Sequence, residues 1–165
     1  MTRAVQTAAP IANALDLPLH PLDIFETSGP FEEDAESGDR SPYPGASRSE
    51  LLALSERLQL ADDVDEQGWW RGEVELLDAV LDRAKAAIAA VRERHPADAT
   101  LALVTHGHFT QYLLMAFLRI ERIGGWITID NTAVTLLEED PRWPDSPNAV
   151  RINSTPHLSD AERTT

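Results

Sequence analysis

Residues 101–115, LALVTHGHFTQYLLM, combine a short apolar run, a turn and the start of a helical pattern. The apolar run Leu101–Val104 is too short for a helix and contains no polar residue. Such a run is typical of a strand that is buried on both faces of a parallel sheet. After residues 105–108 the apolar side chains recur every three or four positions, as in a helix: Tyr112, Leu113, Ala116, Phe117 and Ile120. The stretch therefore predicts a strand, a tight turn and a helix in an α/β fold.

His106 stands at the carboxyl end of this predicted strand. Ligands collect at that edge of open α/β sheets, and a helix that starts there directs free backbone N–H groups at an anion. Three interpretations of the His106-Gly107-His108 segment are open: a pair of metal ligands, a structural turn, or a contact to a phosphate group. Metal sites need further ligands nearby, yet residues 109–111 are Phe, Thr and Gln. Gly107 favours the phosphate because glycine lets a ligand approach the backbone closely. We predict that His108 caps the helix or lies on the rim of the site.

The composition restricts the class of protein and of ligand. With 165 residues, the chain has the length of a single domain. Its 14 basic and 28 acidic residues give a net charge of −14, which argues against binding to nucleic acid or to an anionic membrane. The absence of cysteine excludes disulfides and thiolate chemistry. No membrane span or export signal is visible in the sequence, so we expect a soluble, cytoplasmic protein.

The rest of the chain alternates between helical and strand-like patterns. We predict one helix over Met1–Leu15 and another over Glu73–His95. Ser47 and Glu50 form a predicted capping box that opens a short helix. Short strands are predicted at residues 19–25, 126–129, 133–137 and 150–152. Residues 26–47 lack periodicity and are expected to form a lid-like loop, and 159–165 form a polar tail. Trp69 and Trp70 are expected to pack locally. Residues 1–165 are therefore expected to form one α/β domain.

Two short motifs resemble a known family. Residues 3–8, Arg-Ala-Val-Gln-Thr-Ala, and residues 104–108 are similar to the R-A-x-Q-T-A and [ST]-H-G motifs of the histidine phosphatase superfamily, also called phosphoglycerate mutase-like. Further segments resemble this family at residues 25–29, 43–47, 75–83, 130–133 and 153–158. The resemblance implies a three-layer α/β/α fold with a mostly parallel sheet.

The resemblance also implies a phosphate site. Arg3 and His106 would balance the negative charge of a phosphoryl group, and the backbone N–H groups of Gly107 and His108 would hold its oxygens. No metal or other cofactor is expected. The expected partner is a small phosphorylated substrate.

A glutamate would complete this chemistry. By resemblance, Glu26 is the acid-base residue that protonates the leaving alkoxide and then activates water. The sequence leaves Glu32 and Glu33 open as alternatives, because the alignment of this loop is not fixed.

One defining motif of the family is absent. Arg-His-Gly, which ends the first strand and carries the nucleophilic histidine, does not occur in the chain. His20 and His95 are each followed by proline, and His157 lies near the end of the chain. We expect that the first central strand is missing, through a mis-assigned start codon or a truncated gene. The 165-residue chain should then be inactive.

Three functions follow from this comparison of motifs. The first is a phosphoric monoester hydrolase that acts through a phosphohistidine in its full-length form. The second is a non-catalytic remnant or pseudoenzyme that binds a phosphorylated ligand or serves as an interaction domain. The third is a phosphoglycerate mutase-like phosphotransferase, which would need a second substrate site. The sequence does not identify the substrate or the oligomeric state.

Overall fold

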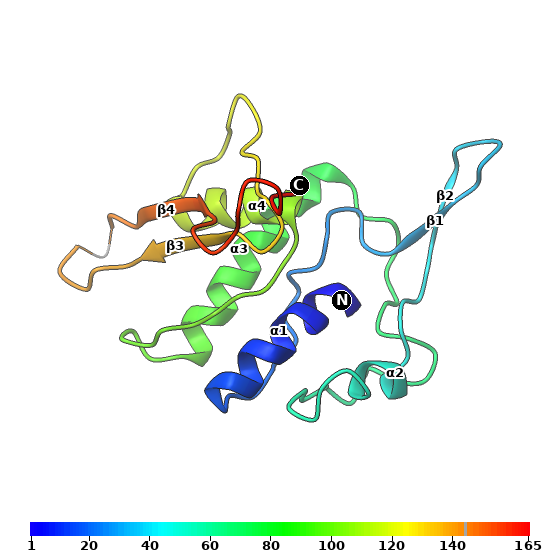
Figure 1. The fold of residues 1–165 in the computed structure, drawn as a ribbon. Coiled ribbons are helices and arrows are strands. Elements are labelled where there is room, and N and C mark those ends of the chain that lie inside the picture. The colour runs from blue at the N-terminus through cyan, green and yellow to red at the C-terminus, as the bar shows by residue number, and fades with distance from the viewer. Residues whose placement is uncertain (144) are drawn as a thin grey trace. The chain divides into compact units, whose positions relative to one another are not determined.

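The structure is a computed structural model that describes residues 1–143 and 145–165. Over these residues the chain forms four helices and two small antiparallel sheets (Figure 1). The elements are α1 (Thr2–Leu15), β1 (Phe31–Glu33), β2 (Arg40–Pro42), α2 (Arg48–Leu52), α3 (Leu77–Arg94), α4 (Gly107–Leu118), β3 (Val134–Glu138) and β4 (Asn148–Ser154). The chain divides into two compact units, one of residues 1–77 with 103–105 and one of residues 78–102 with 106–165.

Helix α1 opens the first unit and confirms the helix predicted at this end of the chain. It continues through Pro10 and ends at Leu15, and its C-cap residue Asp16 adopts a left-handed conformation (φ 56°). Its buried face includes Val5, which joins a core cluster with Leu51, Leu58 and Val64. The helix is therefore held by one apolar stripe, as its sequence pattern indicates.

Helix α2 begins at the capping box predicted from the sequence. The Ser47 hydroxyl accepts a hydrogen bond from the Glu50 N–H (3.3 Å), and the Glu50 carboxylate accepts one from the Ser47 N–H (2.8 Å). Both groups would otherwise lack an intrahelical partner. This prediction is confirmed.

Three aromatic rings form a second packing centre in the first unit. The ring centroids of Phe25 and Trp69 lie 5.5 Å apart, those of Phe25 and Trp70 4.8 Å, and those of the two tryptophans 5.7 Å. Gly29 packs so closely that an added Cβ would lie 3.0 Å from the Trp70 ring. The expected local packing of the two tryptophans is confirmed.

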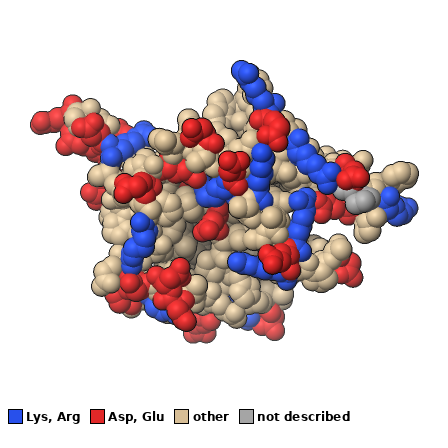
Figure 2. Space-filling model, turned by 180° about the vertical axis from the view of Figure 1, so that it is seen from behind, with Lys and Arg blue, Asp and Glu red and all other residues tan. Residues whose placement is uncertain are grey.

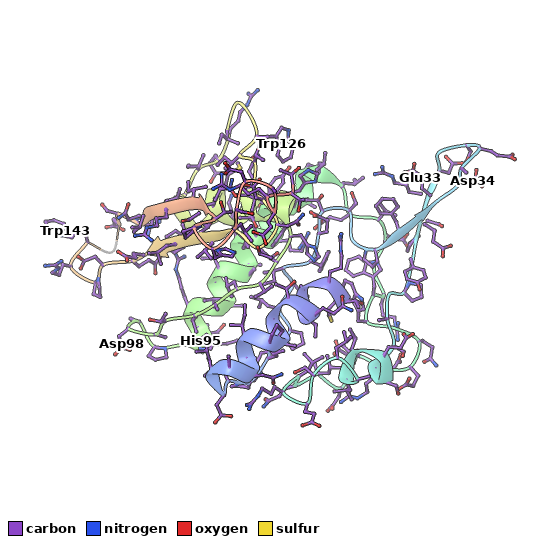
Figure 3. All side chains as sticks on the ribbon, viewed as in Figure 1. Glu33, Asp34, His95, Asp98, Trp126 and Trp143 are labelled. Carbon is purple, nitrogen blue, oxygen red and sulfur yellow. The ribbon has the colours of Figure 1, made fainter. Side chains whose placement is uncertain are left out.

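Residues 26–47 contain an antiparallel hairpin that the sequence did not predict. Phe31 pairs with Pro42 and Glu33 with Arg40, and the Arg40 side chain bonds Glu33 (2.8 Å) and covers the Phe31 ring. Asp34 closes the turn by accepting hydrogen bonds from two backbone N–H groups further along the turn. The strands have three residues each, too few to show an alternating pattern. Acidic side chains gather at the tip of this hairpin (Figures 2 and 3).

Helices α3 and α4 form the core of the second unit. Helix α3 begins four residues later than predicted, at Leu77, and helix α4 begins directly after His106, as predicted. The buried residues of α4 include Phe109, over whose ring the Arg83 guanidinium lies at 4.0 Å. The apolar stripes of both helices therefore face the interior: Val80, Ala84, Ala87 and Ile88 from α3, and Phe109, Leu113, Leu114, Met115 and Ala116 from α4.

Strands β3 and β4 pair in antiparallel orientation, with irregular register between Val134 and Leu137. They confirm the strands predicted near 133–137 and 150–152. Residues 126–129 are not a strand, and the strand predicted at 19–25 is reduced to a single parallel bridge between Leu19 and Leu58.

The predicted parallel sheet is not seen. Residues 101–104 have no strand assignment, and Leu101 and Leu103 are 40% and 41% exposed, so the prediction of a strand buried on both faces is wrong for this structure. A strand exists only through hydrogen bonds to its neighbours. Over residues 1–143 and 145–165, both sheets are two-stranded and antiparallel. The described architecture is a mixed α/β fold and not a three-layer parallel sheet.

Candidate functional site

The start of helix α4 is the best-defined part of the candidate site. His106 is the N-cap residue, with extended backbone (φ −119°, ψ 155°), and its carbonyl accepts hydrogen bonds from the Thr110 N–H (2.9 Å) and hydroxyl (2.8 Å). The His106 side chain is half-buried and makes no capping hydrogen bond. The first N–H groups of an α-helix have no intrahelical acceptor. This end of α4 can therefore attract an anion.

Gly107 is the first residue of α4 and is exposed. A Cβ added there would meet only the Ile129 carbonyl oxygen, at 3.7 Å, which is an ordinary contact. Its backbone is also outside the left-handed region that favours glycine. Neither packing nor backbone conformation requires a glycine at this position, which weakens the interpretation of a purely structural turn. The role of Gly107 in letting a ligand approach the backbone stays a prediction.

His108 is exposed and lies against Trp126. The two ring centroids are 5.4 Å apart, and Tyr112, one turn further along α4, lies 6.3 Å from the same indole. The sequence pattern gave no reason to single out Trp126. Its proximity to His108 depends on how the loop after α4 folds back, which is not encoded in a local motif.

Residues 130–133 and residues 153–158, two segments that resemble the family, contact each other in the second unit. The Asp130 N–H donates to the Asn153 side chain (2.7 Å), which in turn donates to the Asp130 carboxylate (3.1 Å). The Thr132 hydroxyl lies 3.2 Å from Nε2 of His157. The polar turn that follows Ile129, whose carbonyl oxygen an added Cβ on Gly107 would meet, is thus held by Asn153 and His157. The sequence predicted both segments but not their contact.

Arg3 lies in the first turn of α1 in the first unit and is exposed. Burial of the Met1 amino group, and secondarily the positive charge of Arg3, lower the pKa of that amine. A lowered pKa favours the neutral form of the amine, so Arg3 is the cation expected at the start of α1.

Glu26 also belongs to the first unit and lies half-buried on a turn. Its carboxylate accepts a hydrogen bond from the Thr27 N–H (2.8 Å), and its carbonyl accepts one from the Gly29 N–H (3.2 Å). The other two candidate acids, Glu32 and Glu33, are instead exposed on β1, and Glu33 is paired with Arg40. Of the three acids, Glu26 is the one in a partly dry environment.

The structure thus groups His106, Gly107 and His108 at one helix terminus in the second unit, and it places Arg3 and Glu26 in the first unit. Convergence of the two sets stays a prediction. Among the described residues, no group of three or more His, Asp or Glu side chains is placed to hold a metal ion. None of the described helices combines the length and apolar character needed to cross a membrane.

Comparison with known proteins supplies the remaining evidence. No solved structure gives a significant match to this chain. The sequence does match the Histidine phosphatase superfamily (branch 1) over residues 1–153. This range includes both motifs at residues 3–8 and 104–108, and it confirms the resemblance inferred from them. The chain therefore belongs to branch 1 of the histidine phosphatase superfamily.

Proposed function

We propose that this chain carries the phosphate-binding part of a histidine-type phosphomonoesterase, and that the nucleophilic histidine is not among its 165 residues. The observation that supports this most is the start of α4, where His106 precedes a glycine that packing does not require. The expected ligand is a small phosphoric monoester.

The proposed charge balance involves two side chains. A phosphoryl group in transfer carries negative charge on its equatorial oxygens, and preorganised cations and N–H groups stabilise it. Arg3 would supply a permanent positive charge with planar donor geometry. His106 would supply a ring N–H, and Gly107 and His108 would supply backbone N–H groups.

Glu26 is proposed as the acid-base residue. It would protonate the leaving alkoxide and then take a proton from the attacking water. Its half-buried position on a hydrogen-bonded turn supports this choice over the exposed Glu32 and Glu33. Hydrolysis is proposed over phosphotransfer because water needs no second substrate site.

The other histidines do not replace the nucleophile. His20 is exposed before a proline, and His95 is exposed just beyond the end of α3. His157 is exposed and lies 3.2 Å from the Thr132 hydroxyl. None of the three is the N-cap residue of a described helix, as His106 is. This favours a second candidate function for the 165-residue chain, namely binding of a phosphorylated ligand without turnover.

Binding of inorganic phosphate or orthovanadate, followed by NMR of the backbone amides, tests the proposal. We expect the amide signals of Gly107 and His108 to shift with added anion. His106→Ala and Arg3→Ala should each weaken binding by about tenfold or more, because a hydrogen bond to a charged group contributes about 1.5–3 kcal/mol.

The matched control is His95→Ala, an exposed histidine outside the candidate site, which should leave binding unchanged. In the same samples, 4-nitrophenyl phosphate should not be hydrolysed and no phosphohistidine should form. Turnover by this chain would refute the missing nucleophile. Equal binding by the His106→Ala variant and the unsubstituted chain would refute the phosphate site.

A further inference from the structure

Trp126 is a large apolar side chain that the fold leaves in solvent beside the candidate phosphate site. It stands on the loop between α4 and β3 and is 63% exposed (Figure 3). Its indole packs against His108 and Tyr112, which are four residues apart and so lie on one face of α4. The rest of the indole surface is accessible to a ligand.

The loop that carries Trp126 is fixed to α4 by one buried amide. Gln111 is only 4% exposed, and it bonds the residues on both sides of Trp126. Its Nε2 donates to the Gly125 carbonyl (3.4 Å), and its Oε1 accepts from the Ile127 N–H (2.7 Å). Burying an amide is unfavourable unless it is hydrogen-bonded, so these two bonds hold both the glutamine and the loop in place. The exposed indole is therefore held in position rather than carried on a free loop.

The indole is also close to the proposed phosphate. His108 is the second residue of α4, and its N–H is one of those proposed to hold phosphate oxygens. The same residue presents its ring to Trp126 at 5.4 Å. A phosphate bound at this helix end would thus place its esterified group within reach of the indole face. Aromatic and other planar groups pack favourably on such a surface.

We propose that Trp126 forms the leaving-group subsite, and that the preferred substrates are phosphoric monoesters with an aromatic or otherwise planar leaving group. This inference rests on the proposed function, because it requires a phosphate at the start of α4. It specifies the substrate class for that same site.

Binding to the 165-residue chain tests the proposal without requiring turnover. The probes are phenyl phosphate, glycerol phosphate, inorganic phosphate and phenol, and binding is followed by NMR of the four tryptophan indole N–H signals and of the backbone amides. We expect phenyl phosphate to shift the Trp126 signal and to bind about 2- to 12-fold more tightly than glycerol phosphate, which is the range that one aromatic contact provides.

Two substitutions at Trp126 separate ring stacking from apolar bulk. Trp126→Phe retains a ring and should keep part of the preference for phenyl phosphate. Trp126→Leu retains apolar bulk and should remove the preference, while binding of inorganic phosphate stays unchanged. The matched control is Trp143→Leu, because Trp143 is 67% exposed and lies between β3 and β4, outside the site.

The possible outcomes are distinct. Equal affinity of the unsubstituted chain for the two esters, or a preference that survives in Trp126→Leu, would overturn the subsite and leave the phosphate site standing. Phenol binding as tightly as phenyl phosphate would overturn it too, because the indole would then act independently of the phosphate. If inorganic phosphate fails to shift Gly107 and His108, the proposed function fails, and the subsite fails with it.

Discussion

Gly107 and Gly68 differ in whether the fold could accept a side chain at their positions. A Cβ on Gly107 would meet only an ordinary contact at 3.7 Å. Gly68 has φ +111°, and a Cβ there would lie 2.2 Å from the Pro44 carbonyl oxygen. Gly68 is therefore required by the fold, whereas Gly107 is available for a role in binding.

We expect Gly107→Ala to change the free energy of unfolding by less than about 0.5 kcal/mol, as for an uncrowded surface site. It should nevertheless weaken phosphate binding, because the added methyl group lies where a ligand would approach. Gly68→Ala should cost about 2 kcal/mol or more, from left-handed strain and overpacking. Urea unfolding and phosphate titration of the two variants check this prediction. Loss of stability in Gly107→Ala with unchanged binding would contradict it.

The sequence predicted some site residues better than others. His106, Gly107 and His108 follow one another in the sequence at the start of α4, so their grouping needed no tertiary information. Trp126 and Gln111 could not be found in this way. Their roles arise from a loop that folds back on α4 through two hydrogen bonds, and neither residue belongs to a recognisable motif.

Helix α2 shows how much a local motif contributes to an element of the fold. It has only five residues, so its backbone hydrogen bonds alone cannot stabilise it. The capping box and the complete burial of Leu51 supply what the helix itself lacks.

We expect Ser47→Ala to lower the free energy of unfolding by about 1 kcal/mol, because the cap bond to the Glu50 N–H is lost. Chemical denaturation followed by circular dichroism measures this loss. Ser41→Ala, a change at an exposed serine in β2, is the control and should have little effect. If the two variants are equally stable, the cap does not contribute.

Helices were predicted more accurately than strands, for a physical reason. A helix satisfies its backbone within one segment, so apolar periodicity suffices to locate α1, α3 and α4, and the capping box locates α2. A strand depends on a partner that is distant in sequence. Residues 101–104 have the composition of a buried strand, yet they pair with no neighbouring strand, and Leu101 and Leu103 are exposed. The hairpin of β1 and β2 was missed because strands of three residues are too short to show a repeated alternation.

Acid should destabilise the chain through specific carboxylates. Hydrogen bonds from the Arg71 side chain and the Gln67 N–H hold the pKa of Asp65 below its usual 3.8, and the Arg142 side chain and N–H do the same for Asp140. A pKa that is depressed in the folded state gives stability that is present above the unfolded value and lost as the pH falls through the folded value.

The melting temperature should therefore fall as the pH drops below about 4. Asp65→Asn should reduce the size of this fall, since a neutral side chain has no proton to take up. Asp98→Asn, in the exposed loop after α3, serves as the control. Thermal melts between about pH 7 and pH 3 test the prediction, and an identical acid response of the Asp65→Asn variant would refute it.

The two-stranded sheet of β3 and β4 exposes apolar side chains. Val134, Leu136, Val150 and Ile152 are all exposed on these strands. An isolated pair of strands is only marginally stable in water, and uncovered strand edges promote pairing between chains.

We expect the chain to associate as its concentration rises, against the repulsion of its net charge of −14. Replacing Val150 and Ile152 together by lysine should reduce this association, whereas replacing the exposed Leu15 and Leu17 by lysine should not. Sedimentation velocity over a range of concentrations provides the measurement. A monomer at every concentration would contradict the expectation.

The side chain of Gln111 is hydrogen-bonded to the backbone of Gly125 and Ile127, on both sides of position 126, and neither bond involves the side chain of residue 126. The identity of residue 126 is thereby uncoupled from the conformation of its loop. A single codon change at that position can exchange one ligand-facing group for another while the scaffold beneath it is preserved. This makes position 126 an economical starting point for altering ligand preference by directed evolution.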